Sequence, residues 1–387
     1  MNLVYISNTR IPSEKANSYQ SMVMCEAFSK YFNKVEFWYP DGRTTKEMEK
    51  IDDAFDFYQV ERLFELKKVS CLDSDIFFGR ISSIWFLLKN ISFAFNYIKE
   101  LKKIKDETII FSRDVIGLYF LNFAKRINLI KQNVYFEAHI YSKKISNSCK
   151  NIDGLIVINN YLKTLYEKDG IKNILVAHDG VKIETFKEID EIKAKNFLNL
   201  NKDIKYLTYV GRFNTMGNEK GIPEIIESYS HLRNSSLKLL FVGGPLDNLS
   251  FYYDVAKKFN VNKNNLIFID RQPVSELYKY ISASSILLMP FPYNTHYAYY
   301  MSPLKMFEYM ASKRPIVASK LPSICEVLEN KKNAVLCEPD NPKDLADKIN
   351  WVLENDCKDI VNEAFKDVQE YTWDKRAKNI KDFMDKL

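Results

Sequence analysis

Short apolar runs alternate with helical segments along the whole of this chain. In the first half, the runs are rich in β-branched and aromatic residues and are separated by helical patterns, such as those over 19–32 and 160–169. They predict six strands, over 3–7, 35–39, 108–112, 134–137, 154–158 and 174–177. Alternation of this kind is typical of parallel sheets covered by helices on both faces. The first half therefore predicts a doubly wound α/β domain.

The same alternation restarts after residue 182, beyond a polar stretch over 182–205. Five more strands are predicted, over 206–210, 237–242, 266–269, 286–290 and 316–319. The intervening helices are expected to begin near Gly221, Leu249, Val274 and Pro303. The length of 387 residues fits two domains of roughly 150–200 residues each. We expect one Rossmann-like domain over 1–182, a second over 183–374, and a helix over 375–387 that packs back on the first.

Composition restricts the partners and the compartment. The net charge of +6 favours an anionic partner, such as a nucleotide diphosphate or an acidic lipid surface. The chain has no continuous Lys/Arg tract and no zinc-finger spacing, so nucleic acid is not expected. Six cysteines without a C-x-x-C pair indicate reduced thiols in the cytoplasm. No stretch of about 20 uncharged apolar residues occurs, so a membrane-spanning helix is not expected.

The first motif with chemical content follows the strand predicted over 206–210. Gly211 permits a sharp backbone turn there, and Arg212 then stands at the carboxyl end of the strand. Lys220 comes just before the next helix. Two cations at one crevice suit a diphosphate, because Arg forms bidentate hydrogen bonds and Lys acts as a point charge. Two solvated surface cations are the alternative interpretation.

The second motif begins at Ser302 and opens a helix. Ser302 is a favourable N-cap and Pro303 a favourable first helical residue. The free N–H groups and the positive end of the helix dipole make such a start an anion site. Glu308 follows about one and a half turns later, where its carboxylate is placed to accept two ribose hydroxyls. A capped helix with one exposed Glu is the alternative.

These motifs together resemble the retaining glycosyltransferases of family 4. The order G-R…K-G, strand, G-G, strand, P, then S-P-L-K-x-F-E-Y-M-A and P-I-V-A-S is similar to theirs. The resemblance covers nearly the whole chain and is most specific over 206–330. It implies the GT-B fold, in which two Rossmann-like domains face each other across a cleft. It also implies an enzyme that transfers a sugar from a nucleotide-diphosphate sugar to a glycan or lipid-linked acceptor, in polysaccharide or lipopolysaccharide synthesis.

The resemblance assigns roles to residues of the C-terminal half. Arg212 and Lys220 would hold the donor diphosphate and stabilise its negative charge as it leaves. Glu308 would bind the ribose, and Arg271 lies in the segment where the family receives the base. The implied donor-binding set is Gly211, Arg212, Lys220, Arg271, Tyr300, Ser302, Pro303, Leu304 and Glu308.

One position departs from the family pattern. The family carries a Glu eight residues before the one that matches Glu308, and this chain has Tyr300 there. That Glu contacts the donor sugar in the family, so the identity of the sugar is left open. The substitution also keeps open a non-catalytic protein that binds a nucleotide sugar or a glycan. A sugar-nucleotide epimerase of the same fold is a third hypothesis, although no second set of acid and base carboxylates is identified for it.

The N-terminal half carries weaker but concordant motifs. Asn17 and Ser18 lie in the loop after the first strand, and similar loops line the acceptor side in the family. Arg113 follows another strand and resembles a second cleft element. Glu137-Ala-His139 resembles an E-x-H element whose His reaches toward the donor sugar, so His139 is expected to take part in catalysis. A lone structural His is the alternative.

Neither a metal nor another cofactor is expected. Asp73-Ser-Asp75 has metal-binding spacing without supporting context, and Arg212, Lys220 and a helix N-terminus supply positive charge instead. The segment over 81–105 is apolar on one side and basic toward its end. Such a segment either packs in the core or lies on an anionic membrane, where each basic residue adds about 1 kcal/mol. We therefore expect a cytoplasmic protein with peripheral contact to the inner membrane.

Overall fold

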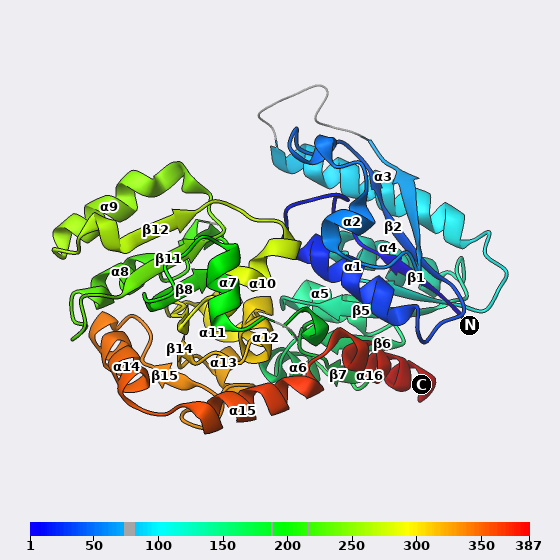
Figure 1. Cartoon of the computed structure of the whole chain (residues 1–387). Helices are drawn as coiled ribbons and strands as arrows, with labels where there is room; N and C mark the ends of the chain where they lie inside the picture. Colours follow the sequence, from blue (N-terminus) through cyan, green and yellow to red (C-terminus); the bar gives the residue numbers. More distant parts are fainter. Residues whose placement is uncertain (73–81, 187–188, 216) are drawn as a thin grey trace. The chain divides into compact units, whose positions relative to one another are not determined.

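The chain folds into two compact units. The computed structural model describes residues 1–72, 82–186, 189–215 and 217–387 (Figure 1). Residues 1–178 and 373–387 form unit 1, and residues 179–372 form unit 2. The unit boundaries lie a few residues before the expected ones at 182 and 374. The reason is that Val181 pairs with Thr372 in a β-bridge inside unit 2.

Unit 1 is built on a seven-stranded parallel sheet with the strand order β3-β2-β1-β4-β5-β6-β7. Its strands are β1 (Asn2–Ile6), β2 (Val35–Asp41), β3 (Glu65–Ser70), β4 (Thr108–Ser112), β5 (Asn133–Ala138), β6 (Gly154–Val157) and β7 (Ile174–Val176). Its helices are α1 (Ala16–Phe28), α2 (Ala54–Tyr58), α3 (Ser82–Leu101), α4 (Val115–Arg126), α5 (Lys143–Cys149), α6 (Asn160–Lys168) and α16 (Trp373–Asp385).

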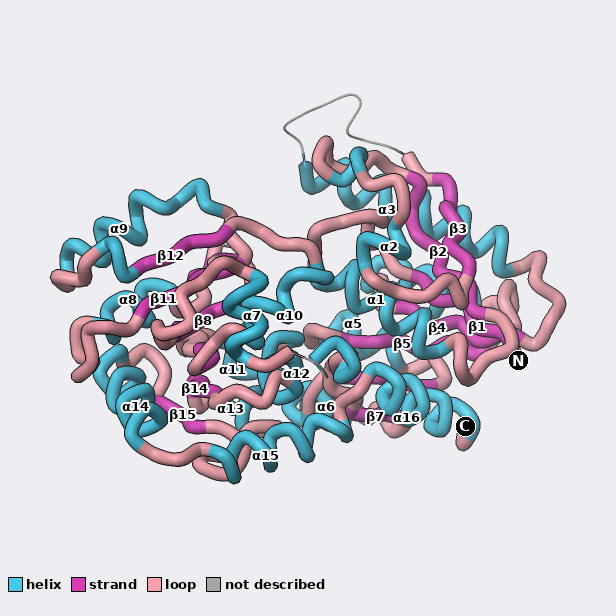
Figure 2. Tube along the Cα trace, viewed as in Figure 1, coloured by secondary structure: helices cyan, strands magenta, loops and turns pink. Residues whose placement is uncertain are grey.

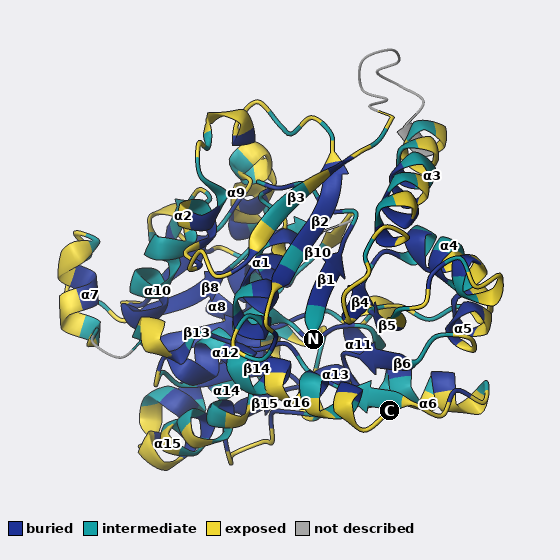
Figure 3. Ribbon diagram, turned by 90° about the vertical axis from the view of Figure 1, so that its right-hand side faces the viewer, coloured by how far each residue is buried: buried dark blue, intermediate teal, exposed yellow. Residues whose placement is uncertain are grey.

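Apolar residues fill both faces of this sheet, as expected where helices cover each side. On one face, Val4 and Ile6 belong to the cluster beneath α3 and α4. On the other, the Tyr5 ring stacks on Phe111 and packs against Phe28 of α1. Figure 3 shows the central strands β1 and β2 almost entirely buried. A continuous apolar run is therefore what strands of this sheet require.

The C-terminal helix α16 is part of unit 1. It packs against α1, and Figure 1 shows it in red at the end of the chain. The Tyr135 hydroxyl of β5 donates to the Met384 carbonyl at 3.2 Å, and the Tyr135 ring packs edge-on against Phe383. Because these contacts reach β5, the last helix closes one face of the sheet.

Unit 2 has a six-stranded parallel sheet with the order β12-β11-β8-β13-β14-β15, and a small antiparallel pair β9-β10 (Figure 2). Its strands are β8 (Tyr206–Val210), β9 (Asn214–Thr215), β10 (Asn218–Glu219), β11 (Lys238–Val242), β12 (Leu266–Ile269), β13 (Ile286–Met289), β14 (Ile316–Ser319) and β15 (Val335–Cys337). Its helices are α7 (Glu191–Phe197), α8 (Ile222–Tyr229), α9 (Leu249–Lys258), α10 (Val274–Ser282), α11 (Thr295–Tyr299), α12 (Leu304–Ala311), α13 (Pro322–Cys325), α14 (Pro342–Glu354) and α15 (Lys358–Asp367).

The two doubly wound sheets confirm the predicted α/β class, and the predicted strands recur within one or two residues at each end. Among the described strands, β3, β15 and the β9-β10 pair were not predicted. β3 is an edge strand of mixed polarity, ELKKVS, that buries only Val69 well, so it lacks an apolar run. β15 has only three residues, which is too short to stand out in a sequence. No helix in the described ranges is long and apolar enough to cross a bilayer.

Candidate functional site

Each sheet reverses its strand order at one point, and polar side chains gather there. In unit 2 the reversal lies between β8 and β13, and in unit 1 between β1 and β4. Ligands of open parallel sheets bind outside the carboxyl ends of the strands at such a point. The residues after β8 and β13, and those after β1 and β4, are therefore the first candidates for a functional site.

The turn after β8 is held by backbone contacts. Gly211 has φ +129°, a conformation that side chains other than hydrogen rarely allow, and its N–H donates to the Val242 carbonyl at 2.8 Å. The Tyr209 hydroxyl donates to the Arg212 carbonyl at 2.9 Å. These contacts fix the main chain of Arg212. Its exposed side chain is therefore attached at a defined point at the end of β8.

Lys220 lies close enough to Arg212 for the charge of Arg212 to affect its pKa. Its N–H donates to the Phe213 carbonyl at 3.0 Å, and Gly221 follows with φ +93° and no room for a Cβ beside the Pro290 carbonyl. Burial and the Arg212 guanidinium together lower the pKa of Lys220 to about 8. Two cations that destabilise each other in this way are arranged to receive an anion.

His296 also belongs to this neighbourhood, although it was not predicted. It lies in α11, which follows β13, and its pKa is lowered by burial and by Lys220. The sequence gives no signal for it, because a His in a short polar segment has no motif around it. The lowered pKa means that His296 is neutral at pH 7 and adds a polar group without adding charge.

The start of α12 differs from the prediction. Pro303 is the N-cap, Leu304 is the first helical residue, and no side chain caps the helix. The Ser302 hydroxyl instead accepts from the N–H of Asp179 at 2.9 Å, so the predicted N-cap role of Ser302 is wrong. Ser302 is buried by that contact. The uncapped N–H groups of α12 are left for other partners.

Glu308 and Lys305 lie on the same helix, one turn apart. Burial raises the pKa of the Glu308 carboxyl to about 7, and Lys305 opposes that rise. Burial also lowers the pKa of Lys305 well below its usual range, and the charge of Lys220 adds to the effect. The sequence motif predicts a binding role for Glu308 and no separate role for Lys305. The structure shows that Lys305, Lys220 and Glu308 interact electrostatically.

The remaining predicted donor residues are less central. Tyr300 caps the C-terminus of α11, and its N–H donates to the His296 carbonyl at 2.9 Å. Arg271 follows β12, which is the edge strand of the sheet and is separated from β8 by β11. Its N–H donates to the Asp270 carboxylate at 2.8 Å. Arg271 therefore lies toward the edge of the sheet, away from the reversal point. At that distance it would contact the base of a nucleotide rather than its phosphates.

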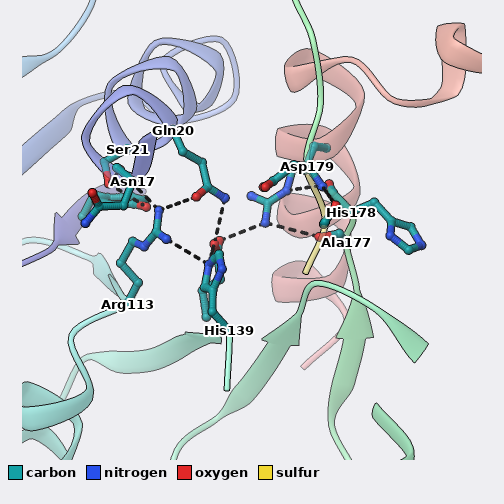
Figure 4. A network of polar contacts seen from close by, with 12 residues as sticks. Asn17, Gln20, Ser21, Arg113, His139, Ala177, His178 and Asp179 are labelled. Carbon is teal, nitrogen blue, oxygen red and sulfur yellow. Dashed lines mark hydrogen bonds and ion pairs between the residues drawn. The ribbon is translucent and has the colours of Figure 1, made fainter. Parts of the chain in front are cut away.

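In unit 1, Arg113 and His139 come together at the ends of β4 and β5. Nη2 of Arg113 lies 3.0 Å from Nε2 of His139, and Nη1 donates to the Gln20 side chain at 2.6 Å (Figure 4). A longer contact, 3.5 Å, joins Nη1 to the carbonyl of Asn17. The structure thus connects three predicted residues, and it adds Gln20, whose position on α1 gave no signal in the sequence.

Ser18 does not fit the predicted role of an acceptor-side contact. Its side chain is fully buried, its hydroxyl donates to the Arg10 carbonyl at 3.1 Å, and it also contacts the Thr9 hydroxyl. Both partners belong to the loop after β1. Ser18 therefore fixes this loop, but Asn17 and Ser18 themselves lie in the first turn of α1 and not in the loop as predicted. Asn17 is only partly buried.

Glu137 is the centre of a buried network behind His139. Its Oε1 accepts from Nε2 of His139 at 2.6 Å and from Gln20 at 3.2 Å, and its Oε2 accepts from Nη2 of Arg376 at 3.0 Å. Both Glu137 and Arg376 are almost completely buried. Burial opposes ionisation of Glu137, but Arg376 and His139 more than offset it and hold the carboxyl pKa well below its usual range.

Arg376 connects this network to the end of β7. Its Nε donates to the His178 carbonyl at 2.9 Å and its Nη2 to the Ala177 carbonyl at 3.3 Å. Figure 4 shows these two carbonyl-bearing residues beside the network. Arg376 was missed because it lies on α16, 239 residues from Glu137 in the sequence. No local pattern reports a contact at that separation.

Nε2 of His139 faces two partners with opposite requirements. Burial and the Arg113 guanidinium lower the pKa of His139, which favours the neutral ring. The ionised Glu137 carboxylate can only accept a hydrogen bond from Nε2, whereas the Arg113 guanidinium can only donate one to it. The His139 side chain is 29% exposed, so its ring is partly accessible to a ligand.

No group of three or more His, Cys, Asp or Glu side chains arranged to hold a metal ion occurs within the described ranges. The candidate pair Asp73 and Asp75 lies outside the residues that the structure describes.

Part of the C-terminal half matches a known protein family. Residues 204–355 match the model of the family described as "Glycosyl transferases group 1". These residues contain β8, the Gly211 turn, Lys220 and the whole of α12. The most specific part of the predicted resemblance therefore coincides with the matched domain.

Two curated relatives show the extent of the similarity. A lipopolysaccharide 1,2-N-acetylglucosaminetransferase of Salmonella typhimurium is 22% identical over 303 residues, which are 74% of this chain and 77% of that protein. An uncharacterized glycosyltransferase of Methanocaldococcus jannaschii is 25% identical over 198 residues, which are 49% of this chain. The chain spans about half the length of that relative, 47%, and of another, 50%. The matched family and these relatives support a transferase enzyme.

Solved structures extend the likeness of fold to the whole chain. Sucrose-phosphate synthase from Thermosynechococcus elongatus has a TM-score of 0.77 at 15% identity, covering 100% of this chain and 98% of that one. Anabaena HepE in complex with UDP and glucose has a TM-score of 0.72 at 14% identity, with 100% of both chains covered. The fold is therefore that of the GT-B glycosyltransferases, with two parallel-sheet α/β domains.

Proposed function

We propose, from the premise that residues 204–355 form a glycosyl transferases group 1 domain, that the protein transfers a sugar from a nucleotide-diphosphate sugar to a hydroxyl of a glycan or lipid-linked acceptor. One observation carries the proposal. Arg212, Lys220 and the start of α12 surround the strand-order reversal in unit 2 with positive charge. We also propose membership of family 4 and retention of the anomeric configuration.

In this proposal the donor diphosphate binds between Arg212 and Lys220. The mutual repulsion that lowers the pKa of Lys220 to about 8 is relieved when an anion binds. The uncapped N–H groups of α12 add donors at the same place. Negative charge grows on the diphosphate as the bond to the sugar breaks, so these groups stabilise the leaving group. Glu308 accepts hydrogen bonds from the ribose.

Transfer is proposed to need no metal, since Arg212 and Lys220 supply the charge that a metal ion would otherwise bring. Arg offers bidentate hydrogen bonds to the diphosphate, and Lys offers a point charge. The expected behaviour is full activity in the presence of a chelator. Loss of activity in EDTA that is restored by Mg²⁺ or Mn²⁺ would overturn this part of the proposal.

The polar cluster around His139 in unit 1 is proposed to bind hydroxyls of the substrates. We propose that the proton on the His139 ring lies on Nε2 and is donated to Glu137, which would leave Nδ1 to accept a hydrogen bond from a hydroxyl. Arg113 is held beside His139 by Gln20, and it also contacts the carbonyl of Asn17 in the first turn of α1.

The relatives narrow the substrate classes. Anabaena HepE binds UDP and UDP-glucose, and the Salmonella relative is named for adding N-acetylglucosamine to lipopolysaccharide. We propose by analogy a UDP-linked donor and an acceptor in lipopolysaccharide or another surface glycan, which would be made at the cytoplasmic face of the inner membrane. Tyr300, in place of the family's Glu, leaves the sugar itself to be determined.

Contact with the membrane is proposed for α3 and α4. Both helices expose large apolar side chains, and Figure 3 shows exposed residues along α3. These side chains are Ile84, Phe86, Leu87, Leu88 and Phe95 on α3, and Tyr119 and Phe123 on α4. Lys99 lies over the ring of Phe95 at 4.2 Å, a basic group positioned to follow an apolar side chain into a lipid interface. Flotation with anionic vesicles, and its loss in Phe86→Ser/Phe95→Ser, tests this contact.

The test of the proposed function is a panel of UDP-, GDP- and ADP-linked sugars with the purified full chain. One nucleotide class should raise the melting temperature, and at a concentration of 100 times Kd it adds about 2.7 kcal/mol to the unfolding free energy. The nucleoside diphosphate should be released with acceptor present, and NMR of the product should show the anomeric configuration of the donor. Arg212→Ala and Glu308→Ala should lose both effects, while Lys257→Ala, an exposed residue of α9, should keep them.

The other outcomes distinguish the alternatives. Stabilisation without release, even with lipid-linked glycans, would favour the non-catalytic binding protein. Conversion of the nucleotide sugar into an epimer without acceptor would favour the epimerase. No response to any nucleotide class would contradict the proposed function.

A further inference from the structure

Lys305 has a buried ammonium group without a hydrogen-bond partner among the described residues. Its Nζ is inaccessible to solvent, although it lies on the second residue of α12. Two aromatic rings lie beside it: the centroid of the Tyr209 ring is 3.5 Å from Nζ, and that of the Phe291 ring is 5.4 Å from Nζ. A long cation held against two rings is ordered, yet none of its three N–H donors has an oxygen to bind.

The position of Nζ is beneath the turn that carries Arg212. A Cβ added to Gly211 would lie 3.0 Å from Nζ and 3.1 Å from Cε of Lys305, so the absence of a side chain at Gly211 makes room for the Lys305 side chain. Gly211 immediately precedes Arg212. The Lys305 ammonium is therefore close to the main chain at the carboxyl end of β8, where the donor is proposed to bind.

An apolar side chain would fill this space at a lower cost. Burying an amine without a hydrogen-bond acceptor costs free energy that a Met of similar length does not incur. Cation–π contact with Tyr209 recovers only part of that cost. A buried polar group left unsatisfied in this way needs an explanation, and a binding partner for it is one.

The charged and titratable groups around Lys305 indicate an anion. Lys220, from the segment before α8, is the cation that lowers the pKa of Lys305, and the Glu308 carboxylate of its own helix opposes that effect. Tyr209 of β8 contributes its ring, and burial raises the pKa of its hydroxyl well above the usual range, so it stays neutral. The Glu308 carboxyl, with a pKa of about 7, is only partly ionised at neutral pH and compensates Lys305 incompletely.

We propose that Lys305 is a third cation of the donor site, which binds the diphosphate of the nucleotide sugar together with Arg212 and Lys220. This inference rests on the proposed function and adds a binding residue to it. A nucleoside without phosphates would gain nothing from Lys305. A nucleoside diphosphate would gain a charge-assisted hydrogen bond in a site of low dielectric.

Proton uptake follows from this role. Burial and Lys220 hold the pKa of free Lys305 well below its usual range, so the charged form of the free amine is disfavoured. A diphosphate beside it restores the charged form, so binding takes up a proton there. Lys220, with a pKa of about 8, also takes up part of a proton, whereas ionisation of Glu308 would release one. Variants of the individual residues separate these contributions.

The test is calorimetric titration of the full chain with UDP, GDP and ADP, and with the matching nucleosides, in two buffers of different ionisation enthalpy at pH 7.5. Lys305→Met should weaken binding of the preferred nucleoside diphosphate by about 10- to 100-fold and reduce proton uptake. It should leave the affinity for the nucleoside unchanged. Lys305→Gln, which keeps a polar end without charge, is measured beside it. Lys257→Met, on the exposed side of α9, is the matched control and should behave as the wild type.

Each outcome supports or overturns the inference. Equal binding of the diphosphate by wild type, Lys305→Met and Lys305→Gln would overturn it while the proposed function stands. Parallel loss of diphosphate and nucleoside binding in both variants would mean that Lys305 only supports the fold of the site, and would also overturn it. Failure of the wild type to bind any nucleoside diphosphate would overturn both the inference and the proposed function.

Discussion

Oε1 of Glu137 lies 2.6 Å from Nε2 of His139, at the carboxyl end of β5. Oε2 of the same carboxylate is bound by Arg376 at 3.0 Å. The carboxylate thus faces a functional side chain on one side and the C-terminal helix on the other. This geometry makes the orientation of His139 depend on a residue at the other end of the chain.

Glu137→Gln should destabilise the protein strongly at neutral pH. The change leaves the buried guanidinium of Arg376 without a counter-charge, and breaking a buried pair in this way costs about 3–5 kcal/mol. Glu137 has a folded pKa below its unfolded value of about 4.3, so its stabilisation is present above that pH and is lost as the pH falls below it. Urea unfolding should therefore show a large difference between variant and wild type at pH 7 and a smaller one near pH 3.

The control for that measurement is Glu167→Gln. Glu167 pairs with Lys163 at 3.8 Å on the surface of α6, where about half of each side chain is exposed. Removal of such a pair should change stability by less than about 1 kcal/mol. Equal effects of the two substitutions would show that Glu137 contributes no more than a surface carboxylate.

Arg376 and His139 should be coupled in activity although they do not touch. Arg376→Gln removes the cation that holds the Glu137 pKa low, so Glu137 binds His139 less firmly. The rate with acceptor should fall in Arg376→Gln and in His139→Ala, and the double variant should be no slower than His139→Ala. Additive losses in this cycle would mean that Arg376 acts only through the stability of the fold.

The fold was predictable where burial dominates, and the site only in part. The strands Thr108–Ser112, Tyr206–Val210, Leu266–Ile269 and Ile316–Ser319 occur with the predicted bounds, because each is a short run dominated by apolar and β-branched residues. Such runs fit strands that are covered by helices on both faces. The polar edge strand β3 has no such run, so no local pattern predicts it.

Predictions from local sequence patterns were wrong where a side chain binds a residue far away in the sequence. The sequence favours Ser302 as an N-cap, yet its hydroxyl accepts from Asp179, 123 residues earlier. Arg376 and Gln20 meet Glu137 only through tertiary packing, so neither could be selected beforehand. Lys305 belongs to the S-P-L-K motif, but its burial against Tyr209 follows only from the packing of β8 and α12 against each other.

Gly211→Ala should impair donor binding more than it impairs the fold. At φ +129° an Ala is strained, and its Cβ would lie 3.0 Å from Nζ of Lys305, which is a flexible end that can move away. The displaced ammonium would leave its place beneath the Arg212 turn. We expect weaker binding of the nucleoside diphosphate, by about tenfold or more, with unfolding changed by only about 1–3 kcal/mol. Gly170→Ala, another glycine with positive φ but with nothing near its Cβ, is the control, and it should retain donor binding.

Donor affinity should decrease as the pH rises through about 8, because Lys220 loses its proton there. Lys220→Arg keeps its charge in that range and should remove the decrease, whereas Lys220→Met should bind weakly at every pH.

The free energy of unfolding changes with pH in the opposite direction. The folded pKa of Lys220 is below the unfolded value of about 10.4, so the unfolded chain binds more protons between pH 8 and 10.4, and this group's contribution to the unfolding free energy rises with pH across that window. The measurement is the Kd of the nucleoside diphosphate between pH 6.5 and 9.5, compared with the Kd of the nucleoside over the same range. A profile that is equally steep in wild type and Lys220→Arg would show that another group controls the pH dependence.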